Sequence, residues 1–178
     1  MKTNITLFSL SFLSIILLFG CSAANYPPLD VVKKVDIDRY LGKWYEIARL
    51  PFSQQEGCSC TTAEYELIDS TTIRVINKCI KEGELDDATG KAFVVEGSNN
   101  AKLRVQFFWP FRGDYWVIEL DEENYQYAIV GTPSRKYLWI LSRTPRMDEE
   151  IYNSLIKKAG DKGFDISKLI RTVQDCSN

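Results

Sequence analysis

Short runs of alternating apolar and polar residues fill the chain between positions 44 and 143. The runs are rich in β-branched and aromatic residues, and residues typical of turns separate them. The eight runs cover residues 44–50, 61–68, 72–80, 91–96, 102–108, 114–120, 125–131 and 137–143. Because no helical pattern lies between them, we expect an all-β domain, either an antiparallel sandwich or a barrel.

The pattern changes to a helical period after the eighth run. A single apolar stripe predicts an amphipathic helix, with acidic residues at its start and lysines near its end. The stripe consists of Ile151, Tyr152, Leu155, Ile156 and Ala159. Gly160 or Gly163 would end this helix, and residues 170–174 would form a last extended piece.

Two features are expected before the first strand. The sequence at 38–41 predicts one helical turn, and Pro27-Pro28 keeps residues 22–35 extended.

The first twenty residues are expected to be an export signal. Lys2 precedes an apolar stretch at 7–19, which is too short for an ordinary transmembrane helix. Leu18-Phe19-Gly20-Cys21 resembles the lipobox of bacterial lipoproteins, in which Cys21 would become the lipidated N-terminus. A general secretory signal cut after Ala24 is the alternative. We therefore expect a lipoprotein signal at 1–20, a lipidated tether at 21–35 and one domain at 36–178.

Charge and composition exclude several function classes. The formal net charge is −2 and no basic block is present, so nucleic acid is not an expected partner. The chain has no histidine, which removes Ser-His and Cys-His nucleophiles and every imidazole metal site. Besides Cys21, four cysteines remain, and an even number in an exported chain indicates two disulfides rather than zinc. We expect no cofactor, no metal and no enzymatic activity.

Three motifs, in order, resemble those of one protein family. They are Gly42-Lys43-Trp44-Tyr45-Glu46-Ile47-Ala48-Arg49, the segment 121–131, and Tyr137-Leu138-Trp139-Ile140-Leu141-Ser142-Arg143-Thr144-Pro145. The chain resembles a lipocalin, in particular the bacterial outer-membrane lipocalins similar to apolipoprotein D. The resemblance implies an eight-stranded antiparallel up-and-down barrel with the C-terminal amphipathic helix packed outside. Such a barrel can hold one small ligand.

Strand direction places the two ends of this barrel. Strand one begins at Trp44 and strand eight finishes at Arg143, so both residues lie at the same end, where the guanidinium can stack on the indole. We assign Gly42, Trp44 and Arg143 to this closed end as structural residues. The loops near 51–60, 81–90, 109–113 and 132–136 then surround the open end.

Alternation along each strand predicts which side chains face the interior. It turns Ala48 and Leu120 inward, for example, and it gives a mostly apolar interior suited to an elongated ligand. The candidate ligand-binding residues are Glu46, Tyr65, Val75, Asn77, Val94, Val105, Phe107, Trp116, Ile118, Tyr137 and Trp139. Inward residues nearer the closed end are instead expected to fill a core. Glu46 and Asn77 are polar, and either anchor a lipid headgroup or belong to an internal hydrogen-bond network.

Positions of the cysteines favour the pairs Cys60–Cys176 and Cys58–Cys79. Cys60 continues the outward face of strand two, which a C-terminal tail could reach, while Cys58 and Cys79 lie near the open end. The first pair resembles a bridge in apolipoprotein D-like lipocalins, and Cys60–Cys79 stays open as an alternative. At the same end Phe108-Trp109-Pro110-Phe111 is unusually apolar. This loop could be a ligand gate, a rim that touches a membrane, or a lid packed on its neighbour.

The resemblance implies a carrier anchored to the bacterial outer membrane through Cys21 and facing the periplasm. The expected ligand is a fatty acid, a lysophospholipid or a similar amphiphile, held for storage or transport. Two alternatives are a thiol-dependent enzyme that uses an unpaired Cys79 and a binder of a rigid hydrophobe such as a tetrapyrrole. The sequence leaves the oligomeric state undetermined.

Overall fold

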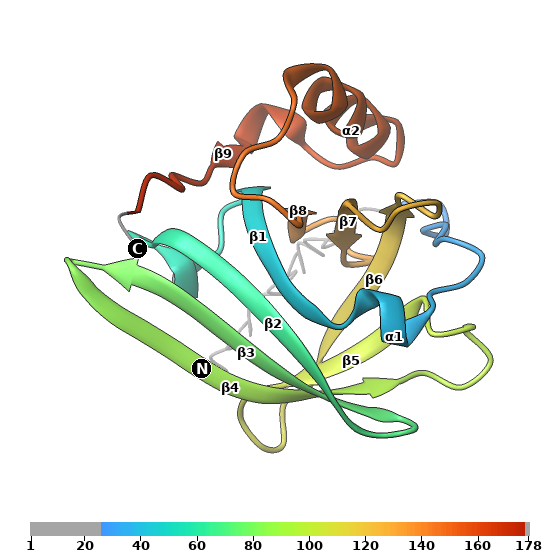
Figure 1. Ribbon diagram of the computed structural model, residues 1–178. Helices are drawn as coiled ribbons and strands as arrows, with labels where there is room; N and C mark the ends of the chain where they lie inside the picture. Colours follow the sequence, from blue (N-terminus) through green and yellow to red (C-terminus); the bar gives the residue numbers. More distant parts are fainter. Residues whose placement is uncertain (1–25, 177–178) are drawn as a thin grey trace, which may run out of the picture.

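Nine strands of the chain form one antiparallel sheet that closes on itself (Figure 1). The computed structural model describes residues 26–176, so the expected signal at 1–20 and the lipidation of Cys21 lie outside the described residues. The strands are β1 (Gly42–Arg49), β2 (Ser59–Asp69), β3 (Thr72–Lys81), β4 (Glu84–Val94), β5 (Lys102–Gln106), β6 (Gly113–Leu120), β7 (Tyr127–Gly131), β8 (Leu138–Ser142) and β9 (Ile170–Arg171).

Each of β1 to β8 pairs with its neighbours in sequence, and β1 pairs with both β8 and β2. This confirms the predicted eight-stranded up-and-down barrel, to which β9 adds an outer strand beside β1. Short helices accompany the strands: α1 (Ile37–Tyr40) precedes β1, and the 3₁₀ turns η1 (Ser53–Gln55) and η2 (Ile166–Lys168) follow β1 and α2.

The helix α2 (Glu149–Asp161) packs outside the barrel, as the apolar stripe predicts (Figure 1). The Asp148 side chain caps its N-terminus by accepting from the backbone amides of Glu150 and Ile151. Leu155 and Ala159 are buried against the outer face of β6 to β8, including Ile129 and Ile140. Residues 26–176 therefore form two apolar clusters, one inside the barrel and one between its wall and α2.

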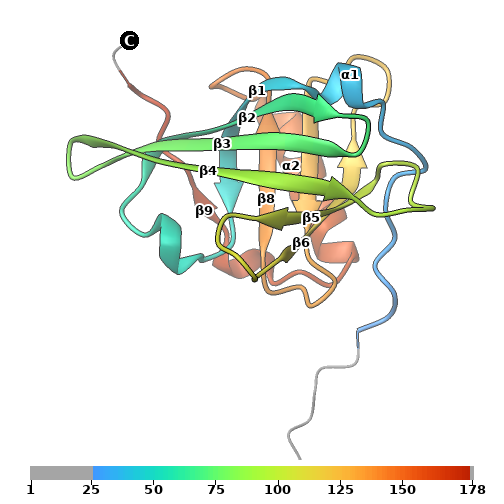
Figure 2. The same ribbon diagram turned by 90° about the horizontal axis from the view of Figure 1, so that it is seen from below.

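Strand β4 begins seven residues before the predicted run at 91–96. Residues 84–90, expected to belong to a loop near 81–90, are part of this strand, and the chain reverses instead at Glu82-Gly83. Both turn residues have positive φ, 54° and 84°, as a two-residue hairpin turn requires. The predicted strand was too short because residues 84–89 are exposed on both faces of the hairpin. Burial therefore imposes no alternation of apolar and polar residues there. The hairpin tip projects beyond the barrel (Figure 2).

Two β-bulges change which side chains face inward. The register of β1 shifts between Glu46 and Ala48, and that of β6 shifts between Val117 and Glu119. Each extra residue reverses the alternation beyond it. As a result Ala48, Trp116 and Ile118, all predicted to face inward, belong to the outer cluster under α2. The predicted orientation of these three residues is wrong. Tyr115 and Val117 contact the interior cluster from β6 instead, together with Leu120, whose inward orientation is confirmed.

The first and last segments of the described residues pack onto the barrel wall. Leu29 and Val35 are buried, and the amide of Val32 donates to the carbonyl of Val117 at 3.0 Å. The C-terminal tail lies between β1 and β2 near the open end. There the amide of Thr172 donates to the Ile47 carbonyl at 3.0 Å, and the amide of Cys60 donates to the Val173 carbonyl at 2.7 Å.

Both predicted disulfides are confirmed. Cys60 is bonded to Cys176 and Cys58 to Cys79, with Cα–Cα separations of 6.1 and 5.6 Å, which removes the alternative pair Cys60–Cys79. The first bridge fixes the tail beside β2, and the second joins the loop after β1 to β3. Among residues 26–176, no helix has the length and apolar composition needed to cross a membrane.

Candidate ligand-binding site

The closed end of the barrel is built around Trp44. Its ring is fully buried, and its indole N–H donates to the Tyr40 carbonyl at 2.8 Å. The Arg143 guanidinium lies 3.9 Å from the centre of the ring, as predicted, and also donates to the carbonyls of Lys43 and Arg39. Gly42 has φ of 84°, and a side chain there would meet the Arg143 guanidinium. These contacts belong to folding and close this end.

Three tyrosine hydroxyls form a chain just inside the closed end. The Tyr115 hydroxyl lies 2.9 Å from that of Tyr40 and 2.8 Å from that of Tyr65. Burial raises the pKa of Tyr65 to about 12 and also raises the pKa of Tyr40 and Tyr115 above the ordinary tyrosine value. All three groups therefore stay neutral at physiological pH and satisfy one another's hydrogen bonds.

The remaining wall of the interior is mostly apolar. Most of the predicted ligand-binding residues belong to the interior cluster or pack against it, namely Tyr65, Val75, Val94, Val105, Phe107 and Trp139. Asn77 shares their face, because it lies two residues beyond Val75 on β3. Asn77, Val105, Phe107 and Trp139 are only partly buried although they face inward, so the interior is accessible to solvent near the open end. Their contact with a ligand stays a prediction.

A short turn after β1 covers part of the open end. We call η1 together with the preceding Phe52 the entrance turn. The Phe52 ring packs edge-on against Tyr137 and Trp139, with ring centres 5.1 and 5.7 Å away. The Gln55 amide bridges two inward residues, accepting from the Trp139 indole at 2.9 Å and donating to Glu46 at 2.7 Å. Tyr137 and Trp139 therefore lie at the entrance, where a ligand would pass.

Glu46 is buried in a hydrogen-bond network. One carboxylate oxygen accepts from the Thr172 hydroxyl and lies 3.4 Å from Nε of Arg49, and the other accepts from Gln55. Burial is the largest influence on Glu46 and raises the pKa of its carboxyl, while these neighbours oppose the rise. Of the two roles expected for Glu46, the structure supports the internal network, with an amide among the partners.

Comparison with known proteins identifies the family. The family model of the lipocalin-like domain matches residues 35–174. The chain is a lipocalin. It is 44% identical over 161 residues to the outer membrane lipoprotein Blc of Vibrio cholerae, and the match covers 89% of this chain and 94% of that protein. It is also 33% identical over 163 residues to apolipoprotein D of Bos taurus, covering 88% of this chain and 85% of the relative.

A solved structure supports the fold of this lipocalin independently. Insecticyanin from the tobacco hornworm Manduca sexta superimposes with a TM-score of 0.70 at 24% identity, over 86% of this chain and 87% of that one. Family and fold together are those of a carrier of small hydrophobic ligands.

The rim of the lipocalin carries an exposed aromatic loop between β5 and β6. Phe108, Trp109 and Phe111 are 76%, 86% and 77% exposed. These exposures exclude the expectation that residues 108–111 form a lid packed on a neighbour. The two other readings, a ligand gate and a rim that touches a membrane, both fit side chains that project into solvent at the open end.

The N-terminal segment reaches the same rim. Arg135, in the loop between β7 and β8, donates to the Pro27 carbonyl at 2.8 Å, and its guanidinium lies 5.2 Å from the ring centre of Tyr26. Figure 2 shows this segment running along the barrel to the end where the loops after β5 and β7 lie. Tyr26, five residues after Cys21 in the sequence, therefore lies at the open end.

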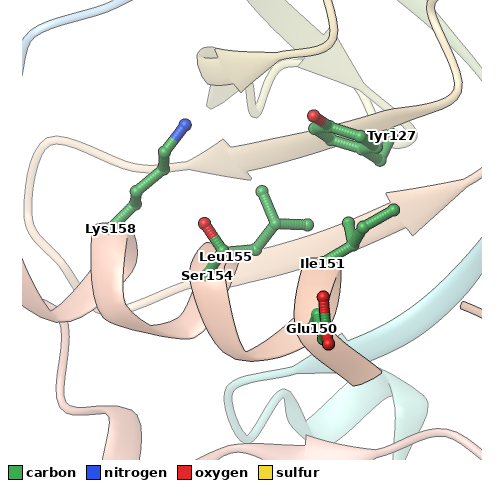
Figure 3. Close-up of a pocket in the computed structure, with 6 residues that line it drawn as sticks. All are labelled: Tyr127, Glu150, Ile151, Ser154, Leu155 and Lys158. Carbon is green, nitrogen blue, oxygen red and sulfur yellow. The ribbon is translucent and has the colours of Figure 1, made fainter. Parts of the chain in front are cut away.

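A small groove lies outside the barrel of this lipocalin (Figure 3). It has a volume of about 200 Å³ between α2 and β7. Its lining residues are Tyr127, Glu150, Ile151, Ser154, Leu155 and Lys158. Drug-sized ligand sites usually exceed about 300 Å³, so this groove is small for an acyl chain, and none of the predicted ligand-binding residues lines it.

The sequence pattern does not indicate an interior role for four residues of the site. Tyr115 and Arg49 were assigned no interior role because the bulges in β6 and β1 turn them inward. Tyr40 lies in α1, and Gln55 lies in the entrance turn, where strand alternation gives no information. One signal could have indicated Arg49: it is a charged residue flanked in the sequence by the apolar Ile47, Ala48 and Leu50.

Proposed function

We propose that this lipocalin is a membrane-anchored carrier that binds one single-chain amphiphile, a fatty acid or a lysophospholipid, inside the barrel. The observation that carries the proposal is the asymmetry of the interior. Trp44 and Arg143 close one end, while apolar side chains near the other end face inward and remain partly exposed. Moving an acyl chain from water into such an interior contributes about 0.8 kcal/mol for each CH₂ group.

The anchor and the rim support a membrane source for the ligand. The lipobox-like sequence ends at Cys21, and relatives at 43–44% identity are named outer membrane lipoproteins. Five residues span at most about 18 Å, so a lipid on Cys21 would hold the rim close to the bilayer. Trp and Phe favour the membrane interface, so the aromatic loop 108–111 would face the lipids from which an amphiphile enters. The carrier would act at the outer membrane, facing the periplasm.

The chemistry of the described residues favours a carrier over a thiol enzyme. Such an enzyme would need an unpaired lumenal cysteine, and the sulfur of Cys79 is bonded to Cys58. Because both sulfurs take part in this disulfide, neither is free to bind a metal as a thiolate. Titration of the mature protein for free thiols checks this pairing, and visible absorbance of the purified protein would reveal a coloured rigid hydrophobe instead.

Native mass spectrometry of the mature protein, followed by solvent extraction and lipid identification, tests the proposal. We expect one co-purified fatty acid or lysophospholipid for each chain, or uptake of one added lipid by an empty barrel. A barrel that is empty and takes up neither lipid would overturn the carrier function.

A further inference from the structure

Arg49 is a buried cation that faces the barrel interior. Beyond the bulge in β1 it lies directly opposite Trp139 in the pairing with β8, and residues opposite each other in a sheet share a face. Trp139 packs against the interior cluster, so Arg49 points to the same side, beneath the entrance turn. Its exposed fraction is 6%.

The hydrogen bonds of Arg49 are incomplete. One terminal nitrogen, Nη2, donates to the Gln55 carbonyl at 2.7 Å, and Nε lies 3.4 Å from Glu46. The other terminal nitrogen, Nη1, is buried and has no acceptor within residues 26–176. A buried donor without a partner is costly, and a charged one especially so. Nε is likewise buried without a hydrogen bond, so this guanidinium has two unused donors for one further acceptor.

Glu46 does not complete the site. Its two oxygens already accept from Thr172 and Gln55, and its contact with Arg49 is a single long one to Nε. Because burial favours the protonated form of Glu46, the positive charge of Arg49 is only partly compensated. The entrance therefore combines an incompletely paired cation with the apolar rings of Phe52, Tyr137 and Trp139.

We propose that Arg49 binds the anionic group, a carboxylate or phosphate, of the amphiphile that enters the barrel. This inference rests on the proposed carrier function. The head of the ligand lies at the entrance, where Nη1 and Nε of Arg49 donate to its oxygens, and the acyl chain extends past Trp139 toward Tyr65. A guanidinium suits this role because its planar donors match carboxylate and phosphate oxygens.

Affinities for a charged ligand and a neutral ligand of the same length test the inference. Dissociation constants of palmitic acid, a C16 lysophospholipid and hexadecanol are measured for the wild-type mature protein and for Arg49→Met. We expect the substitution to weaken the binding of palmitic acid and of the lysophospholipid by about 10- to 100-fold, which is the effect of losing one charged hydrogen-bonded pair. The binding of hexadecanol should weaken by less than about threefold. Arg146→Met, at an exposed arginine outside the barrel, is the matched control and should change none of the three.

Hexadecanol binding also shows that the variant barrel is folded, and Arg49→Lys provides a second variant that keeps the charge. We expect Arg49→Lys to recover part of the lost affinity for palmitic acid. Inorganic phosphate alone should not compete with hexadecanol, since the acyl chain is needed for entry; competition would instead make this a free-phosphate site. An equal loss for all three lipids, or no loss for any, overturns the role of Arg49. Failure of the wild type to bind any of the lipids overturns the carrier function itself.

Discussion

The two ends of the barrel use similar residue types for opposite purposes. At the closed end, Arg143 stacks on the buried Trp44 and donates to backbone carbonyls, so its charge is satisfied by the fold. At the open end, Arg49 lies opposite Trp139 and donates to the Gln55 carbonyl, but two of its buried nitrogens make no hydrogen bond. The Arg143 guanidinium at the closed end is paired within the chain, while the Arg49 guanidinium at the open end keeps donors without acceptors.

Stability should therefore depend most on the closed end. Replacing Trp44 with Ala removes a fully buried indole and the surface on which Arg143 stacks. We expect Trp44→Ala to lower the free energy of unfolding by about 3–5 kcal/mol, as measured by urea denaturation. Trp109→Ala, at an 86% exposed position on the rim, should change it by less than about 0.5 kcal/mol. Equal losses in the two variants would contradict the division between the ends.

The open end should owe its stability to covalent links more than to packing. The Cys60–Cys176 bridge closes a separation of 116 residues and holds the tail between β1 and β2. We expect Cys60→Ser/Cys176→Ser to lower the free energy of unfolding by about 2–5 kcal/mol. It should also speed hydrogen exchange of the residue 60 amide, which donates to the Val173 carbonyl. Exchange that accelerates equally at the closed end, as at the amide of Val35, would show that the bridge stabilises the barrel uniformly instead.

Without the lipid on Cys21, membrane contact should depend on the rim. In the lipid-free mature protein carrying Cys21→Ser, Phe108→Ser/Trp109→Ser removes two exposed aromatic side chains. We expect about 10-fold or greater loss of binding to phospholipid vesicles in a flotation assay, with unfolding free energy unchanged. Ile68→Ser is the control, because Ile68 is 43% exposed near the closed end and should leave vesicle binding intact. Equal losses in the two variants would remove the membrane role of the rim.

A smaller effect should appear in the pH dependence of stability. Burial raises the pKa of Glu46 above its unfolded value of about 4.3, so the folded state favours the protonated carboxyl. The resulting stabilisation is complete below the unfolded pKa and is lost as pH rises through the folded pKa. In chemical denaturation between about pH 4 and pH 8, the wild type should lose stability relative to Glu46→Gln as the pH rises. A constant difference across this range would show that Arg49 and the hydrogen bonds cancel the effect of burial.

The sequence predicted the closed end better than the open end for a physical reason. Alternation with one buried face defines regular strands, so eight strands, α2 and the Trp44–Arg143 contact could all be predicted. In β6, however, Trp116, Val117 and Ile118 are all apolar because α2 covers the outer face. No polar residue there marks the bulge, and the predicted orientations of Trp116 and Ile118 were wrong as a result.

At the open end, side chains are placed by irregular backbone. Gln55 reaches Trp139 and Glu46 from a 3₁₀ turn, and Arg49 faces inward only beyond a bulge. Neither feature follows from strand periodicity, since both depend on tertiary contacts made by the folded chain. The positions of the cysteines favoured the two observed pairs but left Cys60–Cys79 open, because Cys58, Cys60 and Cys79 all lie near the open end.

Quenching of individual tryptophans by a brominated fatty acid tests most directly whether the ligand lies inside the barrel. Trp139 faces the interior at the entrance, Trp116 packs outside under α2, and Trp109 projects from the rim. Binding of the brominated fatty acid should quench the tryptophan fluorescence of the wild type and of Trp116→Phe by similar amounts. It should quench the fluorescence of Trp139→Phe much less. Quenching that persists in Trp139→Phe and disappears in Trp116→Phe or Trp109→Phe would place the lipid outside the barrel and contradict the account.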